Sequence, residues 1–151
     1  MPVDIPAILR ENYLFQGLSE TQLNSIVGLT SVKEFAGGDT IVRQFAEDAD
    51  LMVIAEGKAK IRSFSGEEIA EASSGSVIGE ISLVDDKPRS ATVVSAGGTT
   101  VICINNGQLW SLMNNEPQIA KVILLNIGRI LCARLRAANI ALDSVVERAG
   151  V

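Results

Sequence analysis

Short strand-like runs separated by glycine-containing turns fill the chain from Val32 to Asn105, and this pattern limits the fold more than any other feature. The turns contain Gly37 and Gly38, Gly57, Gly66, Gly75, and Gly97 and Gly98. Side chains alternate between polar and apolar along 58–64, as in a strand with one exposed face and one buried face. Hairpins spaced this closely predict an antiparallel β sandwich or jelly roll rather than a parallel sheet.

Helices are predicted on both sides of this β unit. Ser19 and Gln22 have the spacing of a capping box, which predicts a short helix from about Glu20 to Gly28 as part of an N-terminal helical hairpin. Asn105 can cap a further short helix, and Pro117 begins a long helical pattern that reaches about Val146. We therefore expect one mainly β domain over 1–151 with flanking helices. It comprises N-terminal helices in 1–30, a β roll in 31–105 and C-terminal helices in 106–146.

The long C-terminal helix carries two apolar stripes. The first consists of Ile119, Ile123, Ile127 and Ile130, and the second of Leu124, Leu131, Leu135, Ala138 and Leu142. The first stripe is expected to cover the β unit, and the second, which has coiled-coil-like spacing, to contact the same helix of a second subunit. A homodimer is therefore predicted. The alternative that both stripes are buried within one monomer stays open.

The composition argues against an enzyme. The 151 residues include no histidine, which removes imidazole metal ligands, histidine general bases and Ser-His or Cys-His pairs. The two cysteines, Cys103 and Cys132, have no metal-binding spacing and are expected to be buried free thiols. We therefore expect a non-catalytic protein without a metal or cofactor.

Charge and hydropathy narrow the partners and the location. The net charge is −5, and sixteen of the eighteen acidic residues lie in the first 116 positions, which disfavours a nucleic-acid partner. The apolar run 122–128 is interrupted by Asn126 and closed by Arg129, so no membrane segment is predicted. The N-terminal residues lack the basic and apolar regions of a secretion signal, and this favours a cytoplasmic location.

Residues 79–92 interrupt the strand pattern with a set of groups suited to a sugar phosphate. The planar fork of Arg89 matches two phosphate oxygens, and Ser90 adds a hydroxyl beside it. If 81–84 forms a helical turn, its first amides point at the same phosphate, and Gly79 permits a close backbone approach. A carboxylate so near a phosphate needs donors, so Glu80 suggests a ribose hydroxyl as the other half of the ligand.

Each of these residues also has an ordinary structural interpretation. Arg89 can form a surface ion pair with Asp85 or Asp86, Glu80 can be a solvated turn residue, and Gly79 can be an ordinary turn glycine. The combination at this spacing inside a β unit favours the binding site.

Several segments together resemble the cyclic nucleotide-binding domain family, which includes the catabolite activator protein and regulatory subunits of cyclic AMP-dependent kinases. The segments are Phe15–Ser19, Gly38–Arg43, Val53–Lys58, the 79–92 cassette and the helix after Pro117. The resemblance implies that Glu80 binds the ribose, that Arg89 and Ser90 bind the cyclic phosphate, and that Gly79, Ile81, Ser82 and Ala91 line the cassette. Serine after the arginine favours cyclic AMP over cyclic GMP. Ile78 and Ser82 depart mildly from the usual pattern.

Arg134 lies close to the isoleucine stripe by helical angle, so its charge is expected to face the domain. Such a charge needs a partner, and both the purine of a nucleotide and a carboxylate at the domain edge would serve. The resemblance implies a cyclic nucleotide receptor that signals by movement of the C-terminal helix, with no effector visible after Val146 and an unknown downstream partner. The alternative is a nucleotide-free interaction or dimerisation module with the same fold.

Overall fold

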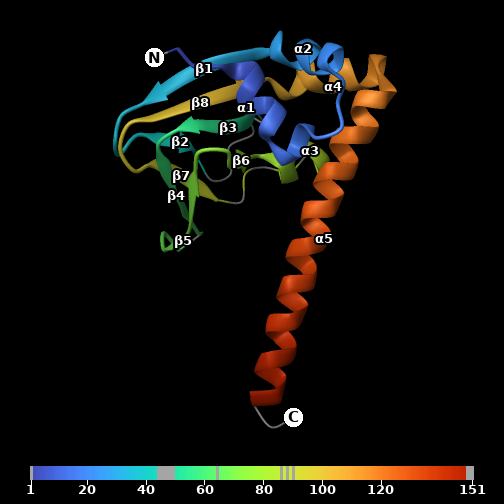
Figure 1. The fold of residues 1–151 in the computed structure, drawn as a ribbon. Coiled ribbons are helices and arrows are strands. Elements are labelled where there is room, and N and C mark those ends of the chain that lie inside the picture. Colours follow the sequence, from blue (N-terminus) through green and yellow to red (C-terminus); the bar gives the residue numbers. More distant parts are fainter. Residues whose placement is uncertain are drawn as a thin grey trace.

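Two four-stranded antiparallel sheets form the body of the protein, as a computed structural model shows (Figure 1). The structure describes residues 2–43, 50–63, 65–85, 87, 89 and 91–148, with the backbone alone for 146–148. The strand order is β1-β8-β3-β6 in one sheet and β2-β7-β4-β5 in the other. The strands are β1 Thr30–Phe35, β2 Thr40–Val42, β3 Leu51–Glu56, β4 Lys58–Arg62, β5 Glu68–Ser73, β6 Val77–Ile78, β7 Thr92–Ser95 and β8 Thr99–Ile104.

The central strands β3 and β8 are buried on both faces because they lie between two hydrophobic cores. Successive side chains of a strand point to opposite faces. Leu51 and Val53 of β3 accordingly contribute to the core under the helices, whereas Met52 and Ile54 contribute to the core between the sheets. The three resulting layers, which are helices, first sheet and second sheet, confirm the predicted mainly β sandwich with flanking helices.

The N-terminal helices form as the local sequence predicts. They are α1 Ile5–Glu11, the 3₁₀ helix η1 Tyr13–Phe15 and α2 Glu20–Val27. The capping box at Ser19 and Gln22 is present with both reciprocal hydrogen bonds. A bond that the sequence does not reveal ties this region to the C-terminal helix, because buried Asn126 donates to the carbonyl oxygens of Leu14 and Gln16, each at 2.9 Å.

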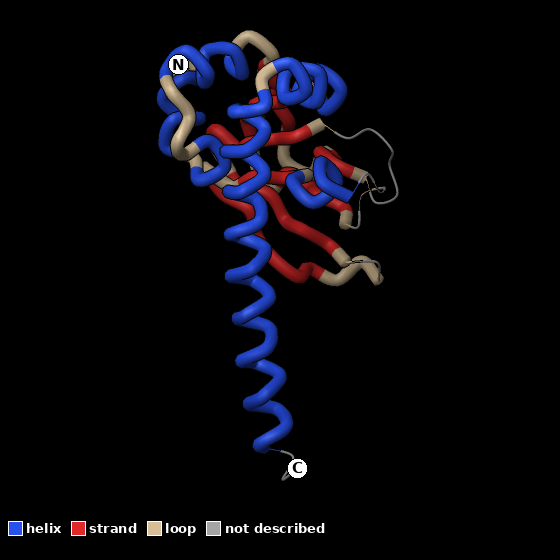
Figure 2. Tube along the Cα trace, turned by 90° about the vertical axis from the view of Figure 1, so that its right-hand side faces the viewer, coloured by secondary structure: helices blue, strands red, loops and turns tan. Residues whose placement is uncertain are grey.

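After a short turn at Glu116, the helix α4 Asn106–Asn115 leads into the 32-residue helix α5 Pro117–Arg148. The N-terminal half of α5 packs on the body, and the C-terminal half projects away from it (Figures 1 and 2). Ile119, Ile123 and Ile127 of the first stripe are fully buried, as predicted, whereas Ile130 is half-buried. In the part of the chain that the structure describes, no helix combines the length and apolar character needed to cross a membrane.

The structure overturns one expectation from the sequence. Cys103 is a buried free thiol as predicted, but Cys132 is exposed. The expectation rested on how often free cysteines are buried, whereas helical periodicity places Cys132 on the opposite side of α5 from buried Ile123. Leu135 and Leu142 of the second stripe are likewise exposed, at 63% and 60%, so this stripe is not buried within one monomer.

Candidate functional site

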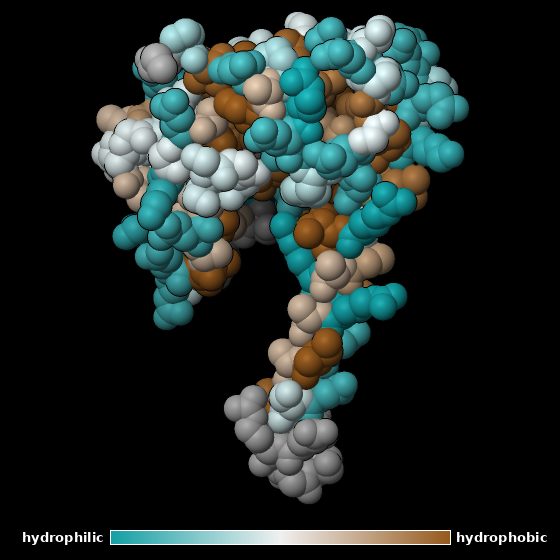
Figure 3. Space-filling view, viewed as in Figure 1, coloured by the Kyte–Doolittle hydropathy of each residue, from teal (hydrophilic) through white to brown (hydrophobic). Residues whose placement is uncertain are grey.

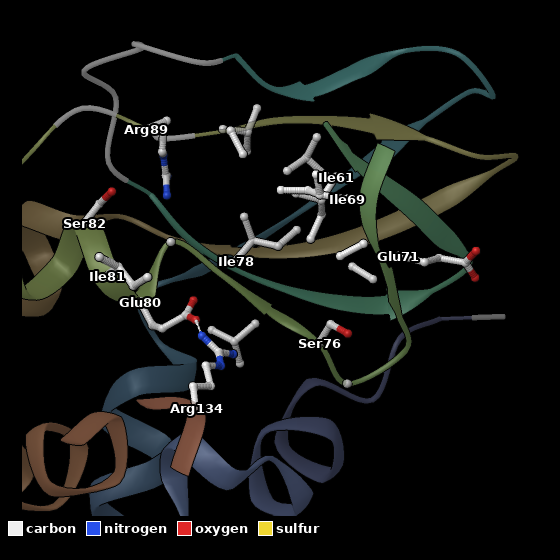
Figure 4. Close-up of a pocket in the computed structure, with 18 of the residues that line it drawn as sticks. Ile61, Ile69, Glu71, Ser76, Ile78, Glu80, Ile81, Ser82, Arg89 and Arg134 are labelled. Atoms are coloured by element: carbon white, nitrogen blue, oxygen red, sulfur yellow. Dashed lines mark hydrogen bonds and ion pairs between the residues drawn. The ribbon is translucent and has the colours of Figure 1, made fainter. Parts of the chain in front are cut away.

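A cavity of about 840 Å³ opens between the second sheet, the β6–α3 segment and α5, where α3 is Glu80–Asp85 (Figure 4). It brings together seven of the eight residues predicted for the site. These are Gly79, Glu80, Ile81, Ser82, Arg89, Ala91 and Arg134. The eighth, Ser90, lies outside the described residues. The cassette expected at 79–92 therefore borders a single cavity in the described part of the chain.

Gly79 and Arg89 make the closest contact at the cavity wall. Gly79 has a φ of +96°, a conformation that favours glycine, and a Cβ there would lie 2.1 Å from Nη1 of Arg89. The Arg89 side chain lies against this backbone with only 5% of the residue exposed, and its Nη2 donates to the carbonyl oxygen of Asp50. The burial of Arg89 does not fit the alternative of a surface ion pair. Gly79 is needed because the Arg89 side chain lies so close to its backbone.

Glu80 lies across the cavity from Arg89, as Figure 4 shows, and is paired with the long helix. Its Oε1 accepts a hydrogen bond of 2.9 Å from Nη1 of Arg134. The Glu80 side chain is 7% exposed and that of Arg134 is 54% exposed. Glu80 is therefore not a solvated turn residue. Of the two partners considered for Arg134, the structure contains the carboxylate, and that carboxylate is Glu80.

The cavity also has an apolar part. Ile61 of β4 and Ile69 of β5 lie together away from Arg89 and Glu80, and Ile78 of β6 lies between them and the cassette (Figure 4). A ligand that fills the whole cavity would thus meet a guanidinium on one side, a carboxylate on the other and a hydrocarbon surface beyond them. Such an arrangement suits an anion joined to a hydroxylated ring and a flat, weakly polar group.

Sequence reasoning missed two contributors to this site. The Asp50 carbonyl accepts a hydrogen bond from Arg89, which is 39 residues away in the sequence, and no local motif predicts such a contact. Tyr13 of η1 lines the cavity beside Glu80 and Arg134. Burial raises the pKa of its hydroxyl, the Glu80 carboxylate raises this pKa further, and the Arg134 guanidinium lowers it.

A further hydrogen bond links the cassette to the C-terminal helices. The indole N–H of Trp110 on α4 donates to the carbonyl oxygen of Leu83 on α3 at 3.2 Å. Trp110 is the only tryptophan of the chain, so its fluorescence provides a probe of changes in its surroundings. Hydrogen bonds thus connect the cavity wall to α5 through Glu80 and to α4 through α3.

Residues 32–116 match the family model of the cyclic nucleotide-binding domain, which is more than half of the sequence. The chain belongs to the cyclic nucleotide-binding domain family. The match includes the complete cassette and ends at the turn before α5.

Known cyclic nucleotide-dependent kinase proteins are similar in sequence to this chain. A cAMP-dependent protein kinase regulatory subunit of Debaryomyces hansenii is 31% identical over 123 residues, which cover 82% of this chain and 25% of that protein. A cGMP-dependent protein kinase of Plasmodium berghei is 35% identical over 102 residues, which cover 68% of this chain and 12% of that protein. The chain therefore spans a quarter or less of the length of these two relatives.

Among solved structures, the catabolite activator protein of Thermus thermophilus superposes with a TM-score of 0.75 at 25% identity, covering 89% of this chain and 63% of that chain. This agreement confirms the fold. It also extends along most of the sequence, including both sets of flanking helices in addition to the β unit.

Proposed function

We propose that this chain is a non-catalytic receptor for a cyclic nucleotide, and that cyclic AMP is its preferred ligand. The observation that carries the proposal is the single cavity in which Arg89 and Glu80 lie on opposite sides while an apolar surface lies beyond them. Arg89 would hold the oxygens of the cyclic phosphate, together with the amides of the first turn of α3. Glu80 would accept from the ribose 2′-hydroxyl, and Ile61 and Ile69 would contact the base.

The choice of cyclic AMP rests on the residue after the arginine. Ser90 lies outside the described residues, so the preference depends on the resemblance of the sequence to family members with serine at this position. The relatives support both nucleotides, since one is named a cAMP-dependent and another a cGMP-dependent protein.

No metal or cofactor takes part in the proposed binding. The predictions of a cytoplasmic location and of no nucleic-acid partner remain inferences from the sequence.

The Arg134–Glu80 ion pair suggests how binding reaches the long helix. A ribose hydroxyl directed at Glu80 shares the carboxylate with Arg134, so the nucleotide changes the geometry of the ion pair that joins the cassette to α5. The ligand then shifts α5 between two positions by its differential contacts with each. The Trp110–Leu83 bond provides the corresponding route to α4.

Calorimetric titration of the full chain with cyclic AMP and with cyclic GMP tests the receptor proposal. We expect about one nucleotide per chain and tighter binding of cyclic AMP. Tighter binding of cyclic GMP would overturn the choice of nucleotide and leave the receptor intact. No heat with either nucleotide, together with unchanged Trp110 fluorescence, would favour the second candidate, a nucleotide-free interaction module.

We also propose that the protein forms a homodimer through α5. Leu124, Gly128, Leu131, Leu135, Ala138, Leu142 and Val145 follow one another at alternating steps of four and three residues, the period of a coiled coil. Apolar side chains are visible along the projecting helix in Figure 3, and Leu135, Leu142 and Val145 of this stripe are exposed. An identical helix is the simplest partner, because a symmetric contact pairs the stripe with itself.

Replacing Leu135 by glutamate is expected to convert the dimer into a monomer, because it places two carboxylates in the apolar contact. Light scattering after gel filtration measures the mass. Arg136→Glu is the matched control, since Arg136 is also exposed but is not part of the apolar stripe, being about 100° around the helix from Leu135. A wild-type chain that elutes as a monomer with and without cyclic AMP would contradict the dimer, as would an equal effect of both substitutions.

A further inference from the structure

Tyr13 lines the cavity and carries a hydroxyl that the proposed binding scheme does not use. Tyr13 belongs to η1, far in sequence from the cassette, yet it lines the cavity with Glu80, Val77 and Arg134. Its hydroxyl oxygen is buried and makes no hydrogen bond with any of the described residues. A buried hydroxyl without a partner is costly, so a role in the ligand-bound state would explain it.

Glu80 is a charged acceptor that lines the same cavity as Tyr13. The Glu80 carboxylate and the Arg134 guanidinium are the two charged groups that act on the pKa of the Tyr13 hydroxyl, and the carboxylate is the only acceptor of these two. Glu80 uses Oε1 to accept from Arg134. A carboxylate offers about four acceptor positions, so it can accept from Arg134, a ribose hydroxyl and a phenol together.

The backbone of η1 is held firmly enough to aim this side chain. The Asn12 side chain accepts from the Leu14 amide and donates to the Gly75 carbonyl at 2.7 Å, which ties η1 to the loop before β6. Asn126 bonds the Leu14 and Gln16 carbonyls from α5. Contacts from both the loop before β6 and the long helix therefore hold the segment that carries Tyr13.

We propose that Tyr13 donates a hydrogen bond to the Glu80 carboxylate when a nucleotide is bound and thereby orients this carboxylate toward the ribose 2′-hydroxyl. Tyr13 is then a positioning residue of the site, since its hydroxyl is buried behind the cavity surface and acts through Glu80. The inference rests on the proposed nucleotide binding and adds a residue from the N-terminal helices to it. It also makes a chemical prediction, because the effect of Tyr13 must depend on the 2′-hydroxyl of the ligand.

Tyr13→Phe tests the proposal, since it removes the hydroxyl and keeps the ring. Calorimetric titrations of the full chain with cyclic AMP and with its 2′-deoxy analogue are compared. We expect the variant to bind cyclic AMP about three- to tenfold more weakly than the wild type and to bind the 2′-deoxy analogue with unchanged affinity. In a Glu80→Ala background, Tyr13→Phe should have no further effect on cyclic AMP, because the two residues act as one unit.

Ser76→Ala is the matched control, because it removes another hydroxyl from the cavity wall and should not discriminate between the two ligands. A similar loss of both ligands in Tyr13→Phe would assign Tyr13 to the general structure of the cavity and overturn the inference. Unchanged binding of both ligands would also overturn it. A wild-type chain that binds neither nucleotide would instead refute the proposed function itself, which is a different result from either of these.

Discussion

Arg89→Lys is expected to weaken cyclic AMP binding by about ten- to a hundredfold, the loss of one charge-assisted hydrogen bond. The buried guanidinium donates to the Asp50 carbonyl through Nη2, and Arg89 lines the cavity. Lysine keeps the charge but has a single nitrogen, which cannot satisfy the Asp50 carbonyl and two phosphate oxygens in one geometry. Calorimetry measures the affinity, and quenching of Trp110 fluorescence provides an independent titration.

Lys87→Ala is the control for this substitution. Lys87 lies two residues away and is exposed, and its contact within the loop is made by its backbone amide, which donates to Asp85 Oδ1 at 3.0 Å. Removing its side chain should change the affinity by less than about twofold, the range typical of an exposed charge. Equal losses from both substitutions would mean that general positive charge attracts the nucleotide and that the phosphate pocket lies elsewhere.

Gly79→Ala is expected to abolish cyclic AMP binding in the micromolar range and to lower the free energy of unfolding by about 2–4 kcal/mol. The positive φ alone costs about 1–2 kcal/mol for alanine. The remainder comes from the collision of the new Cβ with Arg89 Nη1 at 2.1 Å and with the Asp50 carbonyl oxygen at 3.0 Å. The guanidinium must move, and it then leaves both its buried acceptor and the phosphate position. Thermal unfolding and calorimetry measure the two losses.

Gly38→Ala separates the cost of the positive φ from the cost of the collision with Arg89. Gly38 has a φ of +90°, close to that of Gly79, but nothing lies within 4 Å of the position of its Cβ. This substitution should therefore cost only the backbone term of about 1–2 kcal/mol and leave nucleotide affinity unchanged. If Gly79→Ala binds cyclic AMP as Gly38→Ala does, the contact between Gly79 and Arg89 has no role in the site.

Most of the cassette could be predicted because its members are close together in the chain. Gly79, Glu80 and Arg89 lie within eleven residues, so a turn and one short helix are enough to bring them to the same cavity. Local spacing of this kind determines a local geometry. The same reasoning explains why the capping box at Ser19 was correct to the individual hydrogen bond.

Contacts between distant segments were not predictable in the same way. The sequence places Arg134 on the side of α5 that faces the domain, but its partner could be a purine or a carboxylate until the helix is docked. The docking depends on Asn126, whose amide bonds to η1 across more than a hundred residues. The segment that brings Tyr13 to the cavity is held by the same Asn126 bonds. The exposure of Cys132 likewise depends on which side of α5 faces the body.

Periodicity and short motifs were thus sufficient to establish an antiparallel β sandwich, its flanking helices and a cassette for a sugar phosphate, because each depends on residues that are neighbours along the backbone. Only the tertiary structure shows that the Asp50 carbonyl accepts from Arg89, that Glu80 pairs with Arg134 and that Tyr13 lines the same cavity. These contacts depend on the relative placement of whole elements. That placement results from the burial of two hydrophobic cores, to which almost every strand and helix contributes.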